Sequence, residues 1–526
     1  GLPRFAIAQG DQRRSIDIAV QKISNSNTLE VLREQSNVGE RIFFSSIWEG
    51  LIGRDWLGEL RAVPLLATEW KRLSDSAVEL KLRPGVRFHN GDEMTAEDVA
   101  FSFGRERMFG DTPATAQGRT IAVKGEGIPT RAGRELPAEV PAVARRSWPA
   151  LERVEVVDRY TVRFHNASPD VTLEGRLARY GSEIISRRAY VEAPSWFDWA
   201  RKPVTTGPYM VAEFKPDQSL TLVAHDAYWG GRPPLKRIRF LEVPEVSARI
   251  NALRSGEVQF ACDIPPDQIP GIESDAAYEV QGGTILNHRL TVFDKNFPAL
   301  RDARVRRAFT HAIDRQAIVD SLWSGRTVVP RGLQWDYYGD MFIADWSVPK
   351  YDPAEAKRLL KEAGYKGEPI PYRLLNNYYT NQTPTAQVLV EMWSQVGLNV
   401  QIEMKENWTQ ILERSPGRAV RDWSNSAPFN DPVSSLVAQH GPNGQQQQVG
   451  EYSNEELNRL CVELETSTDR PRRKQVFRRL LEIAEREDPA YTVLHQNATF
   501  TAKRKDIRWK AAPAFAMEFR ANNWSA

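Results

Sequence analysis

Hydrophobic residues alternate with charged ones over residues 78–82 (VELKL), which is the period of a half-buried strand. Pro84-Gly85 follows as a turn signal, and residues 86–88 are predicted to return as the second arm of a hairpin. Thr95 then stands three residues before an aspartate, an arrangement close to a capping box. A helix is therefore predicted to begin at Thr95.

The same patterns recur along the chain. Period-two alternation predicts strands, and apolar stripes at i, i+3, i+4 and i+7 predict helices. Strands are predicted at 15–20 and 489–494, hairpins at 154–165 and 209–223, and helices at 302–319, 353–363 and 471–483. Asp352 is the predicted N-cap of the second of these helices, with Pro353 in its first turn.

Residues 108–149 are rich in Pro, Gly, Ala and Arg and have no sustained period, which predicts a long excursion. The arginines there, among them Arg131, Arg134, Arg145 and Arg146, are compatible with an anionic partner. More often, such a group of arginines forms a solvated surface.

Composition excludes several classes. The 70 basic and 68 acidic residues give a net charge of +2, so no polyanion-binding surface is implied and nucleic acid is not expected as a partner. No apolar run approaches the ~18 residues that span a bilayer, so no stable membrane insertion is expected. Cys262 and Cys461 either pair or, as we expect, remain buried free thiols.

Catalytic signatures are missing from the sequence. The seven histidines form no HExxH or Cys/His cluster, and neither a GxSxG elbow nor a P-loop occurs. We therefore predict no enzyme, no cofactor and no metal site. The alternative is a glycoside- or phosphodiester-processing enzyme, because two carboxylates at a suitable separation suffice for glycoside hydrolysis.

A family resemblance rests on dense phrases. LKLRPGVRFHNGDEMTAEDVAFSF (80–103), TGPY (206–209), DAYWG (226–230) and SGEVQFA (255–261) resemble the family 5 solute-binding proteins, the extracytoplasmic receptors of peptide, nickel and opine ABC importers. The resemblance implies an α/β, two-lobe periplasmic binding protein fold of type II (the large cluster C form), with an additional domain inserted in the first lobe. It places lobe I at 11–50, 195–265 and 490–526, the extra domain at 51–194 and lobe II at 266–489.

The resemblance also implies a location and partners. A periplasmic, monomeric receptor is expected to bind a small-molecule solute and to deliver it to an inner-membrane ABC permease. Ala6-Ile7-Ala8 has the small residues that a signal peptidase recognises, so residues 1–10 are either the remnant of a signal peptide or a disordered tail.

One departure from the family concerns the ligand. In the peptide receptors, an aspartate three residues after a tryptophan pairs with the peptide's ammonium group. Here the tryptophan is Trp423 and the third residue on is Ser426, whose neutral hydroxyl lacks the charge that a desolvated ammonium requires. Other phrases in the second lobe resemble the opine branch of the family, in particular its agrocinopine receptors, which implies an opine-like or sugar-phosphate solute. A di- or oligopeptide is the alternative.

Candidate ligand-binding residues follow from these phrases. Amides and hydroxyls suit polyols, aromatic faces cover sugar rings, and arginine binds phosphate bidentately. The candidates are Trp423, Ser424, Asn425, Ser426, Asn443, Gln445, Asn377, Tyr378, Tyr379, Arg421, Arg520, Asn27 and Asn37. Each has a structural alternative, such as a turn, a core position or an ion pair. For a phosphate, the candidates are Arg289, Arg331, Arg421 and Arg520.

Overall fold

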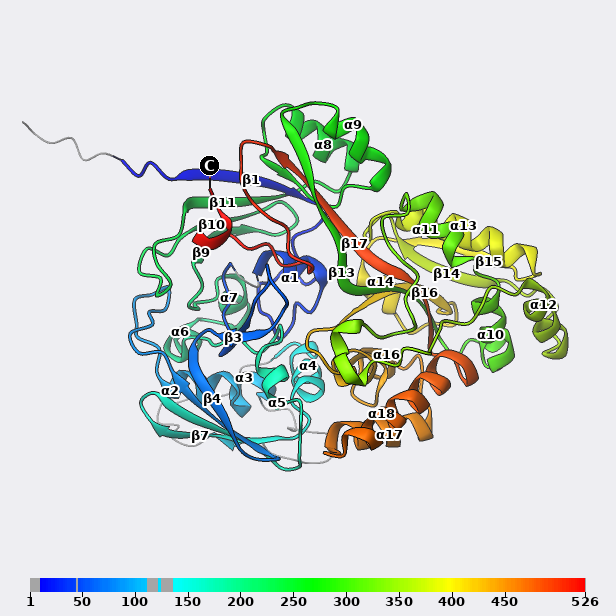
Figure 1. The fold of residues 1–526 in the computed structure, drawn as a ribbon, viewed down its shortest axis with the longest axis horizontal. Helices are drawn as coiled ribbons and strands as arrows, with labels where there is room; N and C mark the ends of the chain where they lie inside the picture. Colours follow the sequence, from blue (N-terminus) through cyan, green and yellow to red (C-terminus); the bar gives the residue numbers. More distant parts are fainter. Residues whose placement is uncertain (1–9, 44–45, 111–121, 124–135, 526) are drawn as a thin grey trace, which may run out of the picture.

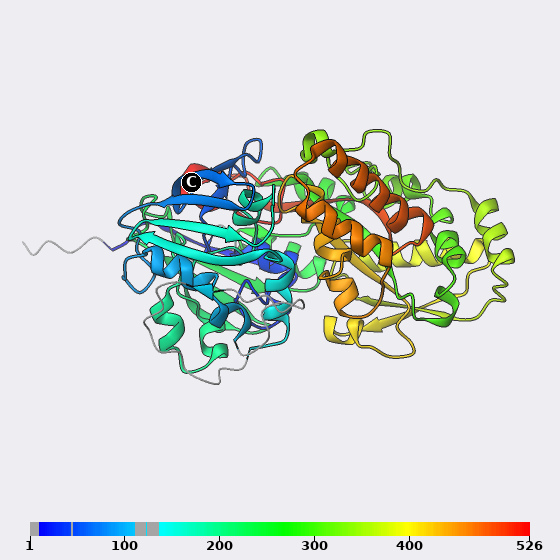
Figure 2. The ribbon, with the colours of Figure 1, turned by 90° about the horizontal axis from the view of Figure 1, so that it is seen from below.

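Two long antiparallel strands, β13 (Tyr278–Phe293) and β17 (Tyr491–Arg504), run through the middle of the molecule and join its two lobes (Figure 1). The computed structural model describes residues 10–43, 46–110, 122–123 and 136–525. Seen from below, the two lobes lie side by side (Figure 2). The predicted remnant at 1–10 falls almost entirely outside the described residues.

One ten-stranded sheet extends through both lobes. Its order is β15 (Val400–Lys405), β14 (Ile370–Leu375), β16 (Val420–Ser426), β13, β17, β12 (Phe260–Ala261), β1 (Arg14–Val20), β11 (Leu235–Glu242), β10 (Ser219–Ala224) and β9 (Tyr209–Lys215). We call the part from β12 to β9 the first-lobe side and the part from β15 to β16 the second-lobe side. Since β13 and β17 belong to both, the domain limits given by the resemblance stay predictions.

The register of the pairing between β13 and β17 changes at the place where the two lobes meet. Residues 278–284 pair with 498–504, and after a register shift between Thr284 and His288 the two strands pair again. Gly282 has φ of 139°, and a Cβ atom there would lie 1.9 Å from the Thr499 carbonyl oxygen. Only glycine allows the two backbones to approach this closely.

The first lobe also carries a smaller sheet. It consists of β4 (Ala67–Ser74), β5 (Ala77–Leu82), β8 (Thr161–Asn166), β7 (Leu151–Asp158) and β6 (Ala122–Val123), and a separate ribbon pairs β2 (Ile52–Arg54) with β3 (Ala62–Pro64). The helices here are α1 (Asn37–Phe43), α2 (Ala96–Ser102), α3 (Arg105–Phe109), α4 (Glu139–Ser147), α5 (Leu173–Leu177), α6 (Arg187–Glu192) and α7 (Trp196–Arg201), with α8 (Val246–Arg254) and α9 (Ile269–Glu273) beside the joining strands.

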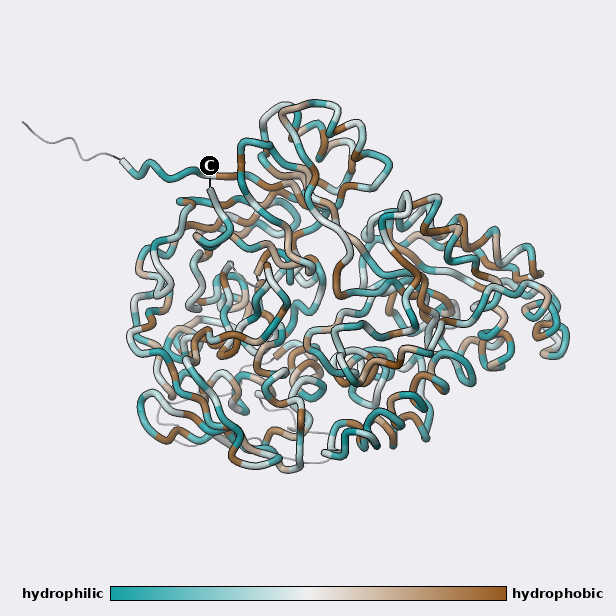
Figure 3. The backbone as a smooth tube through the Cα atoms, viewed as in Figure 1, coloured by the Kyte–Doolittle hydropathy of each residue, from teal (hydrophilic) through white to brown (hydrophobic). Residues whose placement is uncertain are grey.

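Helices surround the second-lobe side of the sheet. They are α10 (Ala303–His311), α11 (Arg315–Leu322), α12 (Pro353–Glu362), α13 (Gln382–Gln395), α14 (Trp408–Leu412), α15 (Leu436–His440), α16 (Gln445–Gln448), α17 (Glu455–Thr466) and α18 (Arg470–Leu481). Hydrophilic and hydrophobic residues alternate along the outer helices, as expected for elements with one buried face (Figure 3).

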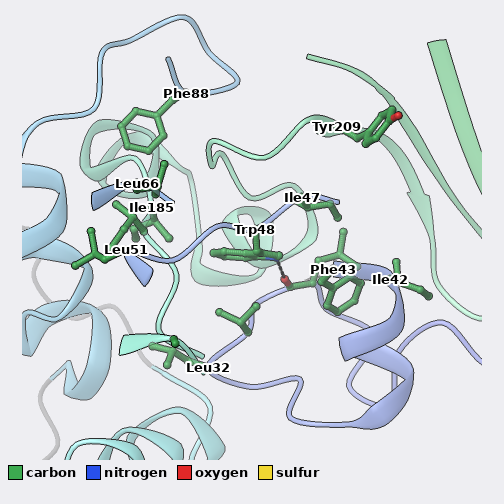
Figure 4. Close-up of a cluster of buried hydrophobic side chains, with 14 of the residues drawn as sticks. Leu32, Ile42, Phe43, Ile47, Trp48, Leu51, Leu66, Phe88, Ile185 and Tyr209 are labelled. Atoms are coloured by element: carbon green, nitrogen blue, oxygen red, sulfur yellow. Dashed lines mark hydrogen bonds between the residues drawn. The ribbon is translucent and has the colours of Figure 1, made fainter. Parts of the chain in front are cut away.

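Three apolar cores hold these layers together. In the first lobe, Trp48 is 1% exposed and lies among aliphatic and aromatic side chains from several segments (Figure 4). Its indole N–H donates to the Leu29 carbonyl at 3.2 Å. A buried tryptophan thus keeps its polar group satisfied.

Most predicted elements are confirmed. The helix after Thr95 is α2, and its capping box with Asp98 is present. Asp352 accepts from the backbone of residue 355 and caps α12, and the two predicted hairpins are β7–β8 and β9–β10. The strands at 15–20 and 489–494 are β1 and the start of β17, and the C-terminal helix is α18. Cys262 and Cys461 are buried and unpaired.

Two predictions were wrong. Residues 86–88 are not the second arm of a hairpin, because β5 pairs with β4 and β8 on its two sides and leaves no free edge for them. Instead, Val86 and Phe88 bury their side chains in the core. The helix predicted at 302–319 is divided into α10 and α11, because Asp314 caps the second one by accepting from the Ala317 backbone.

Candidate functional site

A cavity of about 770 Å³ lies between the two lobes. Its first-lobe wall is formed by the loop 25–37, Arg54, α4 and residues 178–180, and its second-lobe wall by residues 285–287 of β13, Tyr378 and Tyr379, β16, α14 and α16. A volume of this size suits a small-molecule ligand. The described residues therefore enclose a plausible solute site.

The loop at the start of the first-lobe wall is organised by Glu34, which is 1% exposed. Its Oε1 accepts from the Asn25 backbone N–H at 3.0 Å and from the Ser36 hydroxyl. Its Oε2 accepts from the Ser24 hydroxyl at 2.6 Å, and from the Ser26 N–H and hydroxyl at 2.8 and 2.5 Å. Both oxygens are occupied, so this carboxylate serves the loop and is not free for a ligand.

Hydrogen bonds connect the two walls directly. The Asn25 amide donates to the Tyr378 hydroxyl at 2.8 Å, and the Asn37 amide donates to the Ser424 hydroxyl at 2.9 Å. Each of these bonds joins a first-lobe residue to a second-lobe residue. The structure is therefore a closed arrangement of the lobes.

A second set of contacts between the lobes lies beside the cavity. The Arg176 guanidinium binds Asp170 at 2.9 Å within its own lobe and Glu465 of α17 at 3.1 Å across the gap. Arg54 donates to the Tyr337 hydroxyl and to the Pro428 carbonyl of the second lobe. These contacts hold the lobes together at a distance from the joining strands.

On the second-lobe wall, β16 presents an indole and two hydroxyls. Trp423, Ser424 and Ser426 line the cavity. The Asn287 amide of β13 donates to the Ser426 hydroxyl at 2.9 Å, because these two residues are direct neighbours in the sheet. The Ser426 hydroxyl is thus held by a neutral amide.

Aromatic rings gather next to these hydroxyls. The rings of Tyr378 and Tyr379 meet edge to face at 4.9 Å, and Trp408 of α14 lies 5.3 Å from Tyr378. Burial is the main cause that raises the pKa of Tyr379 to about 12, and the pKa of Tyr378 rises for the same reason. Both phenols are neutral and able to donate hydrogen bonds to a solute.

The structure brings most of the candidate residues together. The cavity wall contains Asn27, Asn37, Tyr378, Tyr379, Trp423, Ser424, Ser426 and Gln445. They come from two parts of the sequence, 27–37 and 378–445, and they converge because the loop 25–37, the segment after β14, β16 and α16 meet at the gap between the lobes. Their role in binding a solute stays a prediction.

The other candidates lie outside this wall. Asn425 donates to His440 Nε2 at 2.6 Å, and Asn377 accepts from the Thr383 backbone at the start of α13. Asn443 lies in the turn between α15 and α16. Among the described residues, none of these three side chains lines the cavity.

The four arginines considered for phosphate have other partners. Arg421 binds Glu451 at 2.7 Å, Arg289 lies 3.2 Å from Asp422, and Arg520 binds Glu49 and Glu518, both at 2.9 Å. Arg331 donates to the Ala344 carbonyl. They are absent from the described wall. Arginine is a residue type that suits phosphate, but the guanidinium groups of these four arginines form structural ion pairs and hydrogen bonds.

A different set of arginines, none of them among the candidate site residues, faces the cavity. Arg33, Arg54, Arg145, Arg146 and Arg179 all come from the first lobe. For Arg145 and Arg146 on α4, a solvated surface was the favoured prediction. A detectable signal is the buried stripe of that helix, which includes Val140, Val143 and Ala144 and leaves the arginines at its edge.

Acids on the described wall are fewer: Glu34, Glu40 and Glu139. Glu139 is exposed and lies 3.5 Å from Arg33. Burial raises the pKa of Glu40 to about 7, although Arg54 and Arg41 act in the opposite direction. The described wall therefore carries an excess of positive charge.

In the described residues, no group of three or more His, Cys, Asp or Glu side chains is placed to hold a metal ion. Nor do these residues include a helix of the length and apolarity needed to cross a membrane.

Comparison with known proteins shows which family this chain matches. Residues 61–446 match the family described as bacterial extracellular solute-binding proteins, family 5 Middle. The Dipeptide-binding protein of Escherichia coli is 24% identical over 474 residues, which cover 86% of this chain and 84% of that protein.

Two solved structures share the fold. The dipeptide binding protein from Pseudoalteromonas sp. SM9913 in complex with Met-Leu gives a TM-score of 0.82 at 20% identity, covering 96% of this chain and 99% of that one. PBP AgaA in complex with agropinic acid, from A. tumefacien R10, gives 0.76 at 19% identity, covering 95% and 96%. The α/β, two-lobe, type II periplasmic binding protein fold predicted from the sequence is thereby confirmed.

Proposed function

This chain belongs to the bacterial extracellular solute-binding proteins of family 5, the substrate-binding components of ABC importers, and from that premise we propose that it captures an opine-like or sugar-phosphate solute. The lobes close around the solute in the periplasm, and the monomeric receptor delivers it unchanged to an inner-membrane ABC permease. In a receptor of this kind, function depends on stronger binding of the solute to the closed arrangement.

The observation that carries this proposal is the chemistry of the cavity wall. Amides, hydroxyls and aromatic rings from both lobes suit a polyol, and the described arginines outnumber the acids. Ser426 offers a hydroxyl where the peptide receptors carry an aspartate, and Glu34 is already fully hydrogen-bonded. The wall thus supports a neutral-to-anionic solute better than a peptide ammonium group.

Mass spectrometry of small molecules released from gently purified protein tests the proposal, followed by calorimetric titration. The expected result is release of an intact opine or phosphorylated polyol, and binding of members of a sugar-phosphate panel. A di- or oligopeptide ligand is the competing function, because relatives named for dipeptides match most of the chain. Tight binding of dipeptides without any response to opines or sugar phosphates would overturn our choice.

Trp423→Ala is expected to weaken solute binding by about 1 to 3 kcal/mol, by analogy with other aromatic stacking contacts. The indole lines the cavity, and its ring centroid lies 4.7 Å from the Cζ atom of the Arg421 guanidinium. Titration calorimetry with the released solute measures the change. Trp70→Ala is the control, because this half-buried tryptophan of β4 lies outside the described wall. Unchanged affinity in a normally folded Trp423→Ala protein would remove Trp423 from the site.

Glu40 makes solute affinity depend on pH. Its pKa lies near 7 because of burial, so the side chain loses its negative charge as pH falls through that value. An anionic solute should then bind more tightly at pH 6 than at pH 8, by about threefold to fivefold if the two charges interact by about 1 kcal/mol. Glu40→Gln should flatten this dependence when the same solute is titrated. An identical pH slope in both proteins would exclude Glu40 as its origin.

A further inference from the structure

Arg146 and Arg179, on the first-lobe wall of the cavity, have no carboxylate partner among the described residues. Arg146 is in the last turn of α4, and Arg179 follows α5. Both line the cavity, and within the described parts of the chain neither has an ion pair at 4.0 Å or less. Cations in such a position usually have a partner, because burying an unpaired charge is costly.

Arg179 is fixed by neutral groups alone. It is 5% exposed, and its Nη1 donates to the Ser147 hydroxyl at 3.1 Å. Its Nη2 donates to Gln35 Oε1 at 3.3 Å and its Nε to the Tyr180 carbonyl at 3.1 Å. These contacts set the direction of the guanidinium while leaving its charge uncompensated.

Arg146 has fewer contacts still. Its Nε is buried and lacks any hydrogen-bond partner, and no described residue forms a hydrogen bond or ion pair with its guanidinium. The guanidinium fork, with five N–H donors, is therefore available to a group that enters the cavity.

Nearby acids do not neutralise this pair. Glu139 lies beside Arg33, and the oxygens of Glu34 accept hydrogen bonds from Ser24 and from the loop 25–37. Glu183 accepts from the Gly181 backbone at 2.8 Å, and burial raises its pKa to about 8, so this side chain is largely protonated at neutral pH.

The two cations also disfavour each other. Burial lowers the pKa of Arg146 to about 10. Burial, followed by the charges of Arg146 and Arg176, lowers the pKa of Arg179 to about 9. Both groups still carry a positive charge at neutral pH. An anion placed against them would remove their mutual repulsion and supply the missing hydrogen-bond acceptors.

We propose that Arg146 and Arg179 form the subsite for the phosphate or phosphodiester group of the solute, with Gln35 and Ser147 positioning Arg179. This inference rests on the proposed function and adds to it the orientation of the solute in the cavity. The anionic end of the solute lies against α4, and the hydroxyl groups of the solute face Asn37, Ser424 and Ser426. Arginine suits this role because its planar fork binds phosphate oxygens in pairs.

Calorimetric titration with inorganic phosphate, and with the sugar-phosphate panel, tests the subsite in the full-length protein. Arg146→Gln is the main variant, because its side chain makes no described contact whose loss would unfold the protein. Arg146→Lys keeps the charge without the fork, and Arg188→Gln removes an exposed guanidinium of the same lobe as a control. Phosphate affinity is expected to fall about tenfold or more in Arg146→Gln, less in Arg146→Lys, and not at all in Arg188→Gln.

The results separate this inference from the proposed function. The subsite is overturned if the wild-type protein binds neither inorganic phosphate nor any sugar phosphate. It is also overturned if the wild type and Arg146→Gln bind phosphate with equal affinity. If a sugar phosphate binds equally well to both proteins, the subsite is wrong while the proposed function stands. If phosphate binding depends on Arg146 but no sugar phosphate or opine binds, the subsite stands and the proposed function fails.

Discussion

Glu451→Leu is expected to lower the free energy of unfolding by about 3 to 5 kcal/mol, because it leaves a buried guanidinium without its counter-charge. Arg421 is 1% exposed and Glu451 is 0% exposed. The pair is bidentate: Nε donates to Oε2 at 2.8 Å and Nη2 donates to Oε1 at 2.7 Å. Urea unfolding followed by circular dichroism measures the loss.

Two further variants identify the cause. The double variant Arg421→Met/Glu451→Leu should recover most of the lost stability, because it replaces the ion pair with apolar side chains. Glu456→Ala breaks an ion pair on the surface with Arg479 and should cost less than about 1 kcal/mol. A loss below about 1 kcal/mol in Glu451→Leu would show that Arg421 is solvated or finds another partner, contrary to the structure.

This ion pair also supports the candidate site. The Arg421 guanidinium lies 4.7 Å from the ring of Trp423, whose other contacts include the His440 ring at 5.5 Å. An indole packed between a fixed cation and an imidazole has little freedom to rotate. Arg421, which was predicted to contact the ligand itself, instead supports the position of Trp423 in the candidate site.

Local signals in the sequence were sufficient for many elements. The capping box of Thr95 and Asp98, and the Asp352-Pro353 start of α12, specify backbone hydrogen bonds within three residues. Such bonds form wherever the helix lies in the fold, so a short window of sequence predicts them. The failure at residues 86–88 differs, because one neighbour of β5 is the strand β8, which is distant in the sequence, and only the complete sheet shows that both edges of β5 are occupied.

The candidate site could be predicted only in part, for a related reason. That Trp423, Ser424 and Ser426 lie on the cavity wall could be anticipated, because family phrases mark this segment as a unit. The roles of individual arginines could not be read in this way, since each depends on distant partners. Arg520 binds Glu49, which lies 471 positions away, and so is withdrawn from the cavity. Arg146 lines the cavity and has no ion pair among the described residues. Whether a charge is paired is a property of the fold.

Glu34→Ala is expected to cost about 2 to 4 kcal/mol of stability, because buried donors lose a charged acceptor. Ser24 is 2% exposed and its hydroxyl donates to Glu34 at 2.6 Å, and the Asn25 backbone N–H donates at 3.0 Å. Water in the cavity can replace the carboxylate for the more accessible Ser26 and Ser36, so the loss is smaller than the number of bonds suggests. Thermal and urea unfolding measure it.

The same variant should weaken solute binding by at least about tenfold, because the loop carries groups that must be in place before the lobes close. Glu34 fixes the backbone of Asn25, and the Asn25 amide reaches Tyr378 across the cavity at 2.8 Å. Glu34→Gln is the matched variant: it keeps the side chain's size and one acceptor oxygen, so its losses should be intermediate. Wild-type affinity in a destabilised Glu34→Ala protein would mean that the loop adopts its binding form without the carboxylate. Affinity that falls in the order wild type, Glu34→Gln, Glu34→Ala would instead show that this buried acid prepares the first-lobe wall for binding.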